Sequence, residues 1–147
     1  MPHNAKKKRI MSNLPILRCV VITPESQTVD AEATAVVLPA HDGLLGVLPG
    51  HAPFLCKLGA GLLRYRDPQS REHALFLEKG FGHIRDNEVS ILTPNAITED
   101  DIDAAEADEQ LREAQSLPTS TIEEVQARIE AIQRAKYLRQ LTGYPTS

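Results

Sequence analysis

Three side chains that could bind a metal ion or transfer a proton fall within eleven residues of one another: His41, Asp42 and His51. This spacing does not suit a metal pair on one helix, which needs histidines about one helical turn apart, and no third ligand and no nucleophilic Ser or Cys stands in a recognisable setting. The glycines between Asp42 and His51 match neither the dinucleotide-binding nor the phosphate-loop pattern. We therefore expect no catalytic, cofactor-binding or metal-binding residues in this chain.

The two cysteines are isolated thiols. Cys19 and Cys56 lie in apolar stretches, in neither the Cys-x-x-Cys nor a zinc-ligand spacing, so we expect both to be buried and inert. The N-terminal residues contain no apolar run of the kind found in secretory signals, and they are not rich in Arg and Ser as organelle transit peptides are. Together these features predict a reducing, cytoplasmic setting.

Length and charge limit the possible classes of protein. The 147 residues are 41% hydrophobic, enough for one modest domain with an appendage. The bases from Lys6 to Arg9 are expected to belong to a flexible basic extension over residues 1–13, which leaves residues 11–147 with a net charge of −8. So acidic a body argues against a nucleic-acid partner. No apolar run approaches the roughly 20 residues that a helix needs to cross a bilayer.

Short apolar segments, cut by turn residues, occupy the chain as far as Pro94. Their length and spacing predict an all-β sandwich. Asp86-Asn87 can form a two-residue hairpin turn, because both residue types tolerate a left-handed backbone. The segments expected to be strands are residues 17–23, 31–39, 62–66, 74–77, 81–84 and 88–93.

Residues 43–54 read GLLGVLPGHAPF, with three Gly and two Pro in twelve positions. So many Gly and Pro residues, each of which favours particular backbone conformations, predict an ordered, irregular loop. Its apolar side chains would be costly to leave in water. The loop is therefore either a crossover that covers the core or a surface that contacts another molecule.

After Pro94 the pattern becomes helical. Thr98 followed by Asp101 predicts a helix N-terminus, and Ile97 can pack on Ile102 across the first turn. The expected apolar face is small, so it should bury little area and hold the helix weakly. That face consists of Ala104, Ala107, Leu111 and Ala114.

A second helix is expected to begin at a capping box formed by Ser120 and Glu123 and to end at Gly143. Together the two helices predict an antiparallel hairpin over residues 97–147. The apolar face expected for the second helix consists of Ile122, Val125, Ile129 and Ile132.

The charges of the hairpin are segregated. Residues 99–109 contain seven acids and no base. Two interpretations remain open: the charges complement the helix dipoles on solvated faces, or the basic face of the second helix docks on an acidic partner. The bases of that second helix are Arg128, Arg134, Lys136 and Arg139.

Three stretches resemble the epsilon subunit of F-type ATP synthase: LPAHDGLLGVLPGHAPF (38–54), EKGFGHIRDNEVSILTPNA (78–96) and DIDAAEAD (101–108). The resemblance extends over residues 14–141. It implies an α+β chain, with an N-terminal β-sandwich over residues 14–96 and a C-terminal antiparallel helical hairpin over 97–147. In this family the sandwich holds the gamma subunit and sits on the ring of c subunits. The hairpin folds against the sandwich or extends along gamma and inhibits ATP hydrolysis.

Carried over by position, the resemblance assigns contacts to three sets of residues. His51 would lie near the gamma subunit, and the four bases of the second helix would meet an acidic segment of the beta subunit. The chain would be peripheral on the cytoplasmic face of the bacterial inner membrane and reach the membrane only through the complex of alpha, beta, gamma and c subunits. The residues placed against the c-ring are His41, Asp42, Gly43, Leu44 and Leu45.

One position departs from the ATP-binding members of that family. Their motif [IL]-D-x-x-R-A corresponds here to Ile102 through Ala107, and Glu106 stands where the arginine is expected. An acid repels phosphate, so ATP binding is not expected. The predicted function is a non-catalytic rotor subunit that couples proton flow to ATP synthesis. The alternatives are a freestanding β-sandwich adaptor that binds another protein through its hairpin and, third, an enzyme.

Overall fold

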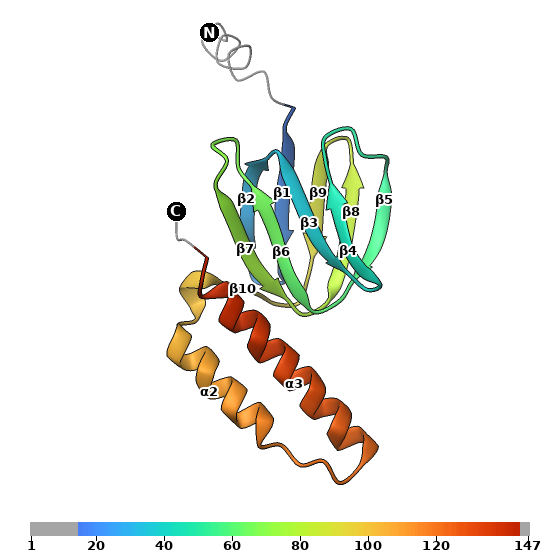
Figure 1. Ribbon diagram of the computed structural model, residues 1–147. Coiled ribbons are helices and arrows are strands. Elements are labelled where there is room, and N and C mark those ends of the chain that lie inside the picture. Colours follow the sequence, from blue (N-terminus) through green and yellow to red (C-terminus); the bar gives the residue numbers. More distant parts are fainter. Residues whose placement is uncertain (1–14, 145–147) are drawn as a thin grey trace, which may run out of the picture.

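The computed structural model describes residues 15–144. The predicted basic extension over residues 1–13 lies outside the described residues. The described chain is a β-sandwich followed by two helices (Figure 1). Its strands are β1 (Leu17–Ile22), β2 (Gln27–Ala33), β3 (Ala35–Ala40), β4 (Gly43–Val47), β5 (Phe54–Leu58), β6 (Gly61–Arg66), β7 (Glu72–Leu77), β8 (Gly80–Arg85), β9 (Glu88–Leu92) and β10 (Ala96–Thr98). The 3₁₀ helix η1 (Glu99–Asp101) and the α-helices α2 (Ala104–Gln115) and α3 (Ile122–Leu141) follow.

The strands form two layers. One layer has the order β2-β1-β9-β8-β5, and the other has β3 between β4 and β6, followed by β7 and β10. A single pair of residues, Ala40 and Leu58, joins β3 to β5 where the layers meet. The pairings are antiparallel apart from β1 with β9, which is parallel. The predicted all-β sandwich is thereby confirmed.

Alternating side chains fill the space between the layers. In β8, for example, Ile84 points inward and is fully buried, whereas Phe81 points outward and is exposed. Cys19 lies in this core, and burial raises the pKa of its thiol to about 12. Cys56 is only half-buried, so the expectation of two buried cysteines is wrong for Cys56. The largest fully buried side chains here are Leu17, Leu38, Leu58, Leu63, Leu75, Leu77, Ile84 and Ile91.

Two expected boundaries are wrong. Residues 31–39 are not one strand, because the chain bends at Thr34 and passes from β2 in one layer to β3 in the other. Residues 43–54 are not one irregular loop, because residues 43–47 form β4, which pairs along β3. Leu45 and Val47 point inward and Leu44 points outward, which is the alternation typical of a strand. This alternation accounts for β4 although the segment contains two glycines. The turn at Asp86-Asn87 is as predicted, with φ of 50° and 62°.

Both α-helices begin later than expected. Thr98 and Asp101 form the predicted capping box, with Thr98 N donating to Asp101 Oδ2 at 2.9 Å, but this box caps η1. Asp103 caps α2 by accepting from Glu106 N at 2.8 Å. The N-cap of α3 is Thr121 rather than Ser120. It accepts from Glu124 N at 3.1 Å.

The hairpin contacts the sandwich through the C-terminal half of α3. Leu138 and Leu141 are fully buried and pack with Leu62 of β6 and Phe76 of β7. The other half of the hairpin extends away from the sandwich (Figure 1). Of the four side chains expected to form the apolar face of α3, Ile122, Val125 and Ile129 are 80%, 39% and 52% exposed, whereas Ile132 is half-buried. In α2, Ala107 and Ala114 are buried as expected, whereas Ala104 is exposed.

Candidate partner-binding surfaces

The β3–β4 turn presents one leucine to solvent. His41 and Asp42 form the exposed turn, and His41 N donates to Lys57 O at 2.8 Å, which ties the turn to β5. Gly43 follows with a φ of +137°, a backbone conformation that favours glycine. Leu44 is 67% exposed, whereas Leu45 packs against the core. The hydrogen bond from His41 to β5 therefore fixes the backbone of the turn, and Leu44 points into solvent beside it.

His51 lies at the opposite end of β4. Gly50 N donates to Asn87 Oδ1 at 2.7 Å, which fastens this loop to the β8–β9 turn. His51 Nδ1 lies 2.7 Å from Ala52 O, within hydrogen-bond distance. The structure thus separates His51 from His41 and Asp42 by the length of a strand. Among residues 15–144 no three His, Cys, Asp or Glu side chains gather closely enough to hold a metal ion.

An apolar groove on the outer face of the β5-β8-β9-β1 layer was missed by the sequence analysis. The register places Phe81 beside Leu92 and Leu92 beside Ile22 on one face. These side chains are 54%, 55% and 38% exposed, and they line a groove of about 530 Å³. The sequence signal for this groove is that apolar residues occur at strand positions that alternate with the core positions, in more than one strand.

Two lysines flank this groove. Lys57 on β5 pairs in register with Phe81, and Lys79 precedes β8. Both lysines are exposed, and neither forms an ion pair within residues 15–144. An apolar groove flanked by free ammonium groups suits a partner segment that carries both apolar and acidic side chains.

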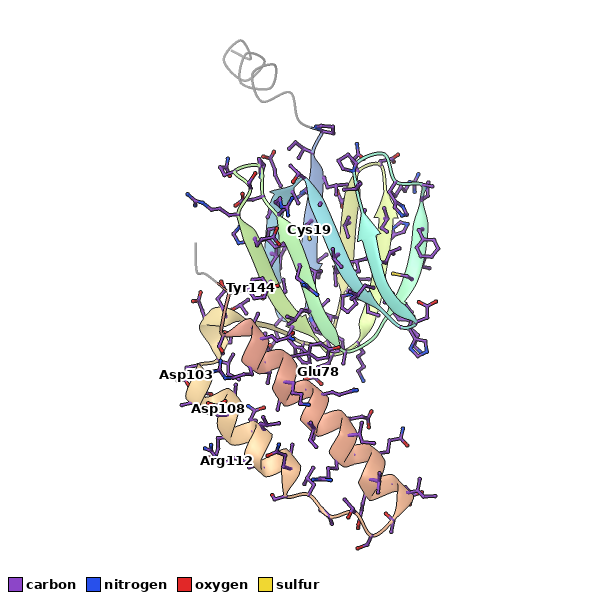
Figure 2. All side chains as sticks on the ribbon, viewed as in Figure 1. Cys19, Glu78, Asp103, Asp108, Arg112 and Tyr144 are labelled. Atoms are coloured by element: carbon purple, nitrogen blue, oxygen red, sulfur yellow. The ribbon has the colours of Figure 1, made fainter. Side chains whose placement is uncertain are left out.

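The bases of the second helix have different surroundings. Arg128 donates to the carbonyl oxygen of Gln115 at 2.9 Å, across the connection between the helices. Arg139 Nε lies 3.0 Å from Asp108 Oδ1 of α2. Lys136 is exposed. Arg134 Nη2 lies 3.0 Å from Glu78 Oε1, at the end of the sandwich nearest α3 (Figure 2). Three of the four bases therefore have partners within the chain.

Glu106 stands in the first turn of α2. Its backbone N–H is already engaged by the Asp103 carboxylate, and its own side chain is exposed. Two carboxylates therefore crowd the end of the helix where the backbone could otherwise attract a phosphate.

The β-sandwich with its appended helical hairpin places this chain in a known structural class, the delta and epsilon chains of ATP synthase. Residues 16–99 match the family model described as the ATP synthase Delta/Epsilon chain β-sandwich domain. The chain is 42% identical to an ATP synthase epsilon chain of Rhodopirellula baltica, over 82% of this chain and 93% of that one. It is 33% identical to ATP synthase epsilon chain 2 of Ralstonia nicotianae, over 86% of this chain and 99% of that one. The chain belongs to this family, which confirms the resemblance.

Solved structures have the same fold. A chain of the Euglena gracilis mitochondrial ATP synthase, in a structure of OSCP, F1 and c-ring, aligns with a TM-score of 0.69 and 22% identity, over 86% of this chain and 78% of that one. A chain of the Tetrahymena thermophila mitochondrial ATP synthase central stalk and c-ring aligns with a TM-score of 0.60 and 13% identity, over 84% and 96%. Neither α2 nor α3 is long and apolar enough to span a bilayer.

Proposed function

We propose that this chain is a non-catalytic rotor subunit of a bacterial F-type ATP synthase, where it couples proton flow to ATP synthesis. The observation that carries the proposal is the exposed apolar groove of Phe81, Leu92 and Ile22, in a chain of the epsilon family. A contiguous apolar surface that lies between exposed lysines suits the binding of a protein partner. The membrane is reached only indirectly, through that partner complex on its cytoplasmic face.

The gamma subunit is the partner proposed for this groove and also for His51, which lies at the other end of the β8–β9 hairpin. Lys57 and Lys79 would meet acidic side chains of gamma, and Phe81 would supply a central apolar anchor. The β3–β4 turn, residues 41–45, would meet the c-ring. Leu44 supports this assignment, because it is the exposed apolar side chain that the turn presents.

The hairpin is proposed to inhibit ATP hydrolysis by placing its bases against an acidic surface of the beta subunit. Exposed ion pairs contribute only about 0–1 kcal/mol each, so several must act together. Because Arg134 is paired with Glu78 of the sandwich, its part in this inhibition requires the hairpin to move away from the sandwich. Arg128 and Arg139 must in addition give up their contacts with α2.

ATP is not proposed as a ligand of the hairpin. The carboxylates of Asp103 and Glu106 lie together at the N-terminus of α2 and repel phosphate. Calorimetry with millimolar ATP should detect no binding to the full chain, and Glu106→Arg should restore binding only in part. A micromolar dissociation constant for the unchanged chain would contradict this.

The test is co-purification from membranes. A tagged full chain, expressed in a host whose own epsilon gene is deleted, should bring down alpha, beta, gamma and c subunits. Phe81→Glu should abolish recovery of the complex, because it places a charge in the groove. Ile122→Glu, at an 80% exposed position of the hairpin, is the matched control and should leave recovery unchanged. A chain that purifies without rotary subunits would instead favour the freestanding adaptor.

A further inference from the structure

Arg134 of α3 forms polar contacts with both the sandwich and α2. Its Nε and Nη2 donate to Glu78 Oε1 at 3.2 and 3.0 Å, and Glu78 lies between β7 and β8. Its Nη1 donates to Gln110 Oε1 of α2 at 3.0 Å. Its guanidinium carbon also lies 5.6 Å from the centre of the Phe76 ring on β7. One planar group therefore joins the two helices to the sheet.

The surroundings of Arg134 strengthen these contacts. Phe76 is fully buried, and its ring also lies beside that of Tyr137 of α3, with ring centroids 6.0 Å apart. The side chains of Arg134 and Glu78 are 35% and 42% exposed, so their ion pair is partly open to solvent and sensitive to salt. A planar guanidinium can stack on an aromatic ring and bind a carboxylate at the same time, which an ammonium cannot do.

Other bases of α3 do not reach the sandwich. Arg139 pairs with Asp108 of α2, and Arg128 donates to Gln115 O at the end of α2. Both contacts therefore move with the hairpin if it leaves the sheet. Removing Arg134 should weaken docking, whereas removing Arg139 should weaken only the hairpin itself.

We propose that Arg134 is a latch that sets how much of the time the hairpin is docked on the sandwich. Nε, Nη1 and Nη2 each donate one hydrogen bond within the chain, so the docked guanidinium keeps only two of its five N–H groups for an external carboxylate. Docking therefore competes with the binding of an acidic partner through Arg134. This last consequence rests on the proposed function, but the latch itself does not.

Thiol labelling of the isolated full chain tests the latch without any partner. Ala74 of β7 is 4% exposed and belongs to the cluster that the hairpin covers, so Ala74→Cys places a thiol that reacts only after release. Cys56→Ser removes the half-buried native thiol. Cys19 stays in the core, and its slow labelling reports global unfolding.

In this background Arg134→Gln should raise the labelling rate of the thiol introduced by Ala74→Cys about tenfold, from the lost ion pair and ring contact together. Glu78→Gln should raise it less, because the contacts to Gln110 and Phe76 remain. The double variant should label no faster than Arg134→Gln alone. High salt should accelerate the unchanged chain but not Arg134→Gln.

Arg139→Gln is the matched control, because it breaks an ion pair between α2 and α3 only. Equal rates for Arg134→Gln and Arg139→Gln would overturn the latch. A parallel rise in Cys19 labelling in Arg134→Gln would also overturn it, unless Glu78→Gln released the hairpin with Cys19 still protected. Since no partner is present, failure of the proposed rotor function would leave these rates unchanged.

Discussion

At the scale of the residue, adjacent leucines in β4 have opposite environments. Leu44 faces solvent and Leu45 faces the core, because successive side chains of a strand point to opposite faces. The same substitution at the two positions should therefore separate binding from folding.

Leu44→Asp should leave the free energy of unfolding within about 0.5 kcal/mol of the unchanged chain. In the assembled complex it should reduce ATP-driven proton pumping more than ATP hydrolysis. Leu45→Asp should cost roughly 3 kcal/mol or more, because it puts a charge against the core. Chemical denaturation and proton-pumping assays measure the two effects. Equal losses of pumping and hydrolysis in Leu44→Asp would count against the c-ring contact.

Asp67 gives the sandwich a pH-dependent contribution to stability. Its Oδ2 accepts from His73 Nε2 at 2.8 Å, and its Oδ1 accepts from two backbone N–H groups in the β6–β7 turn. These hydrogen bonds, that of His73 first, lower the pKa of Asp67 below its ordinary 3.8. The contribution is therefore present above pH 3.8 and is lost as the pH falls through the lower folded value.

Asp67→Asn keeps the Oδ1 acceptor and removes the charge. It should lower the free energy of unfolding near neutral pH, and its difference from the unchanged chain should shrink toward about pH 2. Urea denaturation across this range measures the difference. Asp86→Asn, in the exposed β8–β9 turn, controls for the loss of one carboxylate. A difference for Asp67→Asn that does not vary with pH would contradict this account.

At the scale of the element, two glycines with the same backbone angle have different surroundings. Gly43 and Gly80 have φ of +137° and +138°. A Cβ at Gly43 would meet nothing within 4 Å, whereas a Cβ at Gly80 would collide with the carbonyl oxygen of Leu92. Gly80 therefore lets β8 begin directly against the end of β9.

Gly43→Ala should cost about 1–3 kcal/mol from backbone strain alone. Gly80→Ala should cost a further 1–3 kcal/mol or so, because the backbone of β9 must also shift. The midpoints of thermal unfolding of the two full-length variants give the comparison. Equal destabilisation would mean that the close approach at Leu92 adds nothing to the strain.

Period and turn chemistry predicted most of these elements, and tertiary contacts account for what was missed. The predicted segments cover most of β1, β3, β6, β7, β8 and β9, whereas β4 was hidden by its glycines and β2 by its polar outer face. Strands β5 and β10 were not predicted. The family resemblance predicted that Leu44 lies in an exposed turn. The sequence could not show that Arg134 pairs with Glu78, because that contact joins elements far apart in the chain.

At the scale of the whole molecule, the hairpin is docked at one end only. α3 covers Leu62 and Phe76 with its C-terminal turns, while Ile122 and Ile129 remain exposed on the part that extends away. The small buried face of α2 and this partial docking both keep the cost of release low. Such an arrangement suits an element that must leave the sandwich to act.

Deleting residues 118–147 should raise ATP hydrolysis by the assembled complex and leave ATP synthesis largely intact. Changing the four bases of α3 to Ala should do the same, and high salt should reproduce part of that effect because it screens exposed pairs. Hydrolysis and synthesis rates of purified complexes measure both. A quadruple variant with a less stable hairpin but an unchanged hydrolysis rate would favour the interpretation that the bases only complement helix dipoles and internal acids.

The parallel pairing of β1 with β9 determines the order in which the sandwich can be completed during synthesis. Arg18 is aligned with Glu88, so β1 cannot complete its pairing until residues 88–92 have been synthesised. Until then β1 pairs only with β2, and an isolated two-stranded sheet is only marginally stable in water. The inward face of Leu17 and Val21 is uncovered for most of translation. Ribosome-bound chains should therefore resist protease only once β9 has emerged, and α2 and α3, made last, meet a sheet that is already closed.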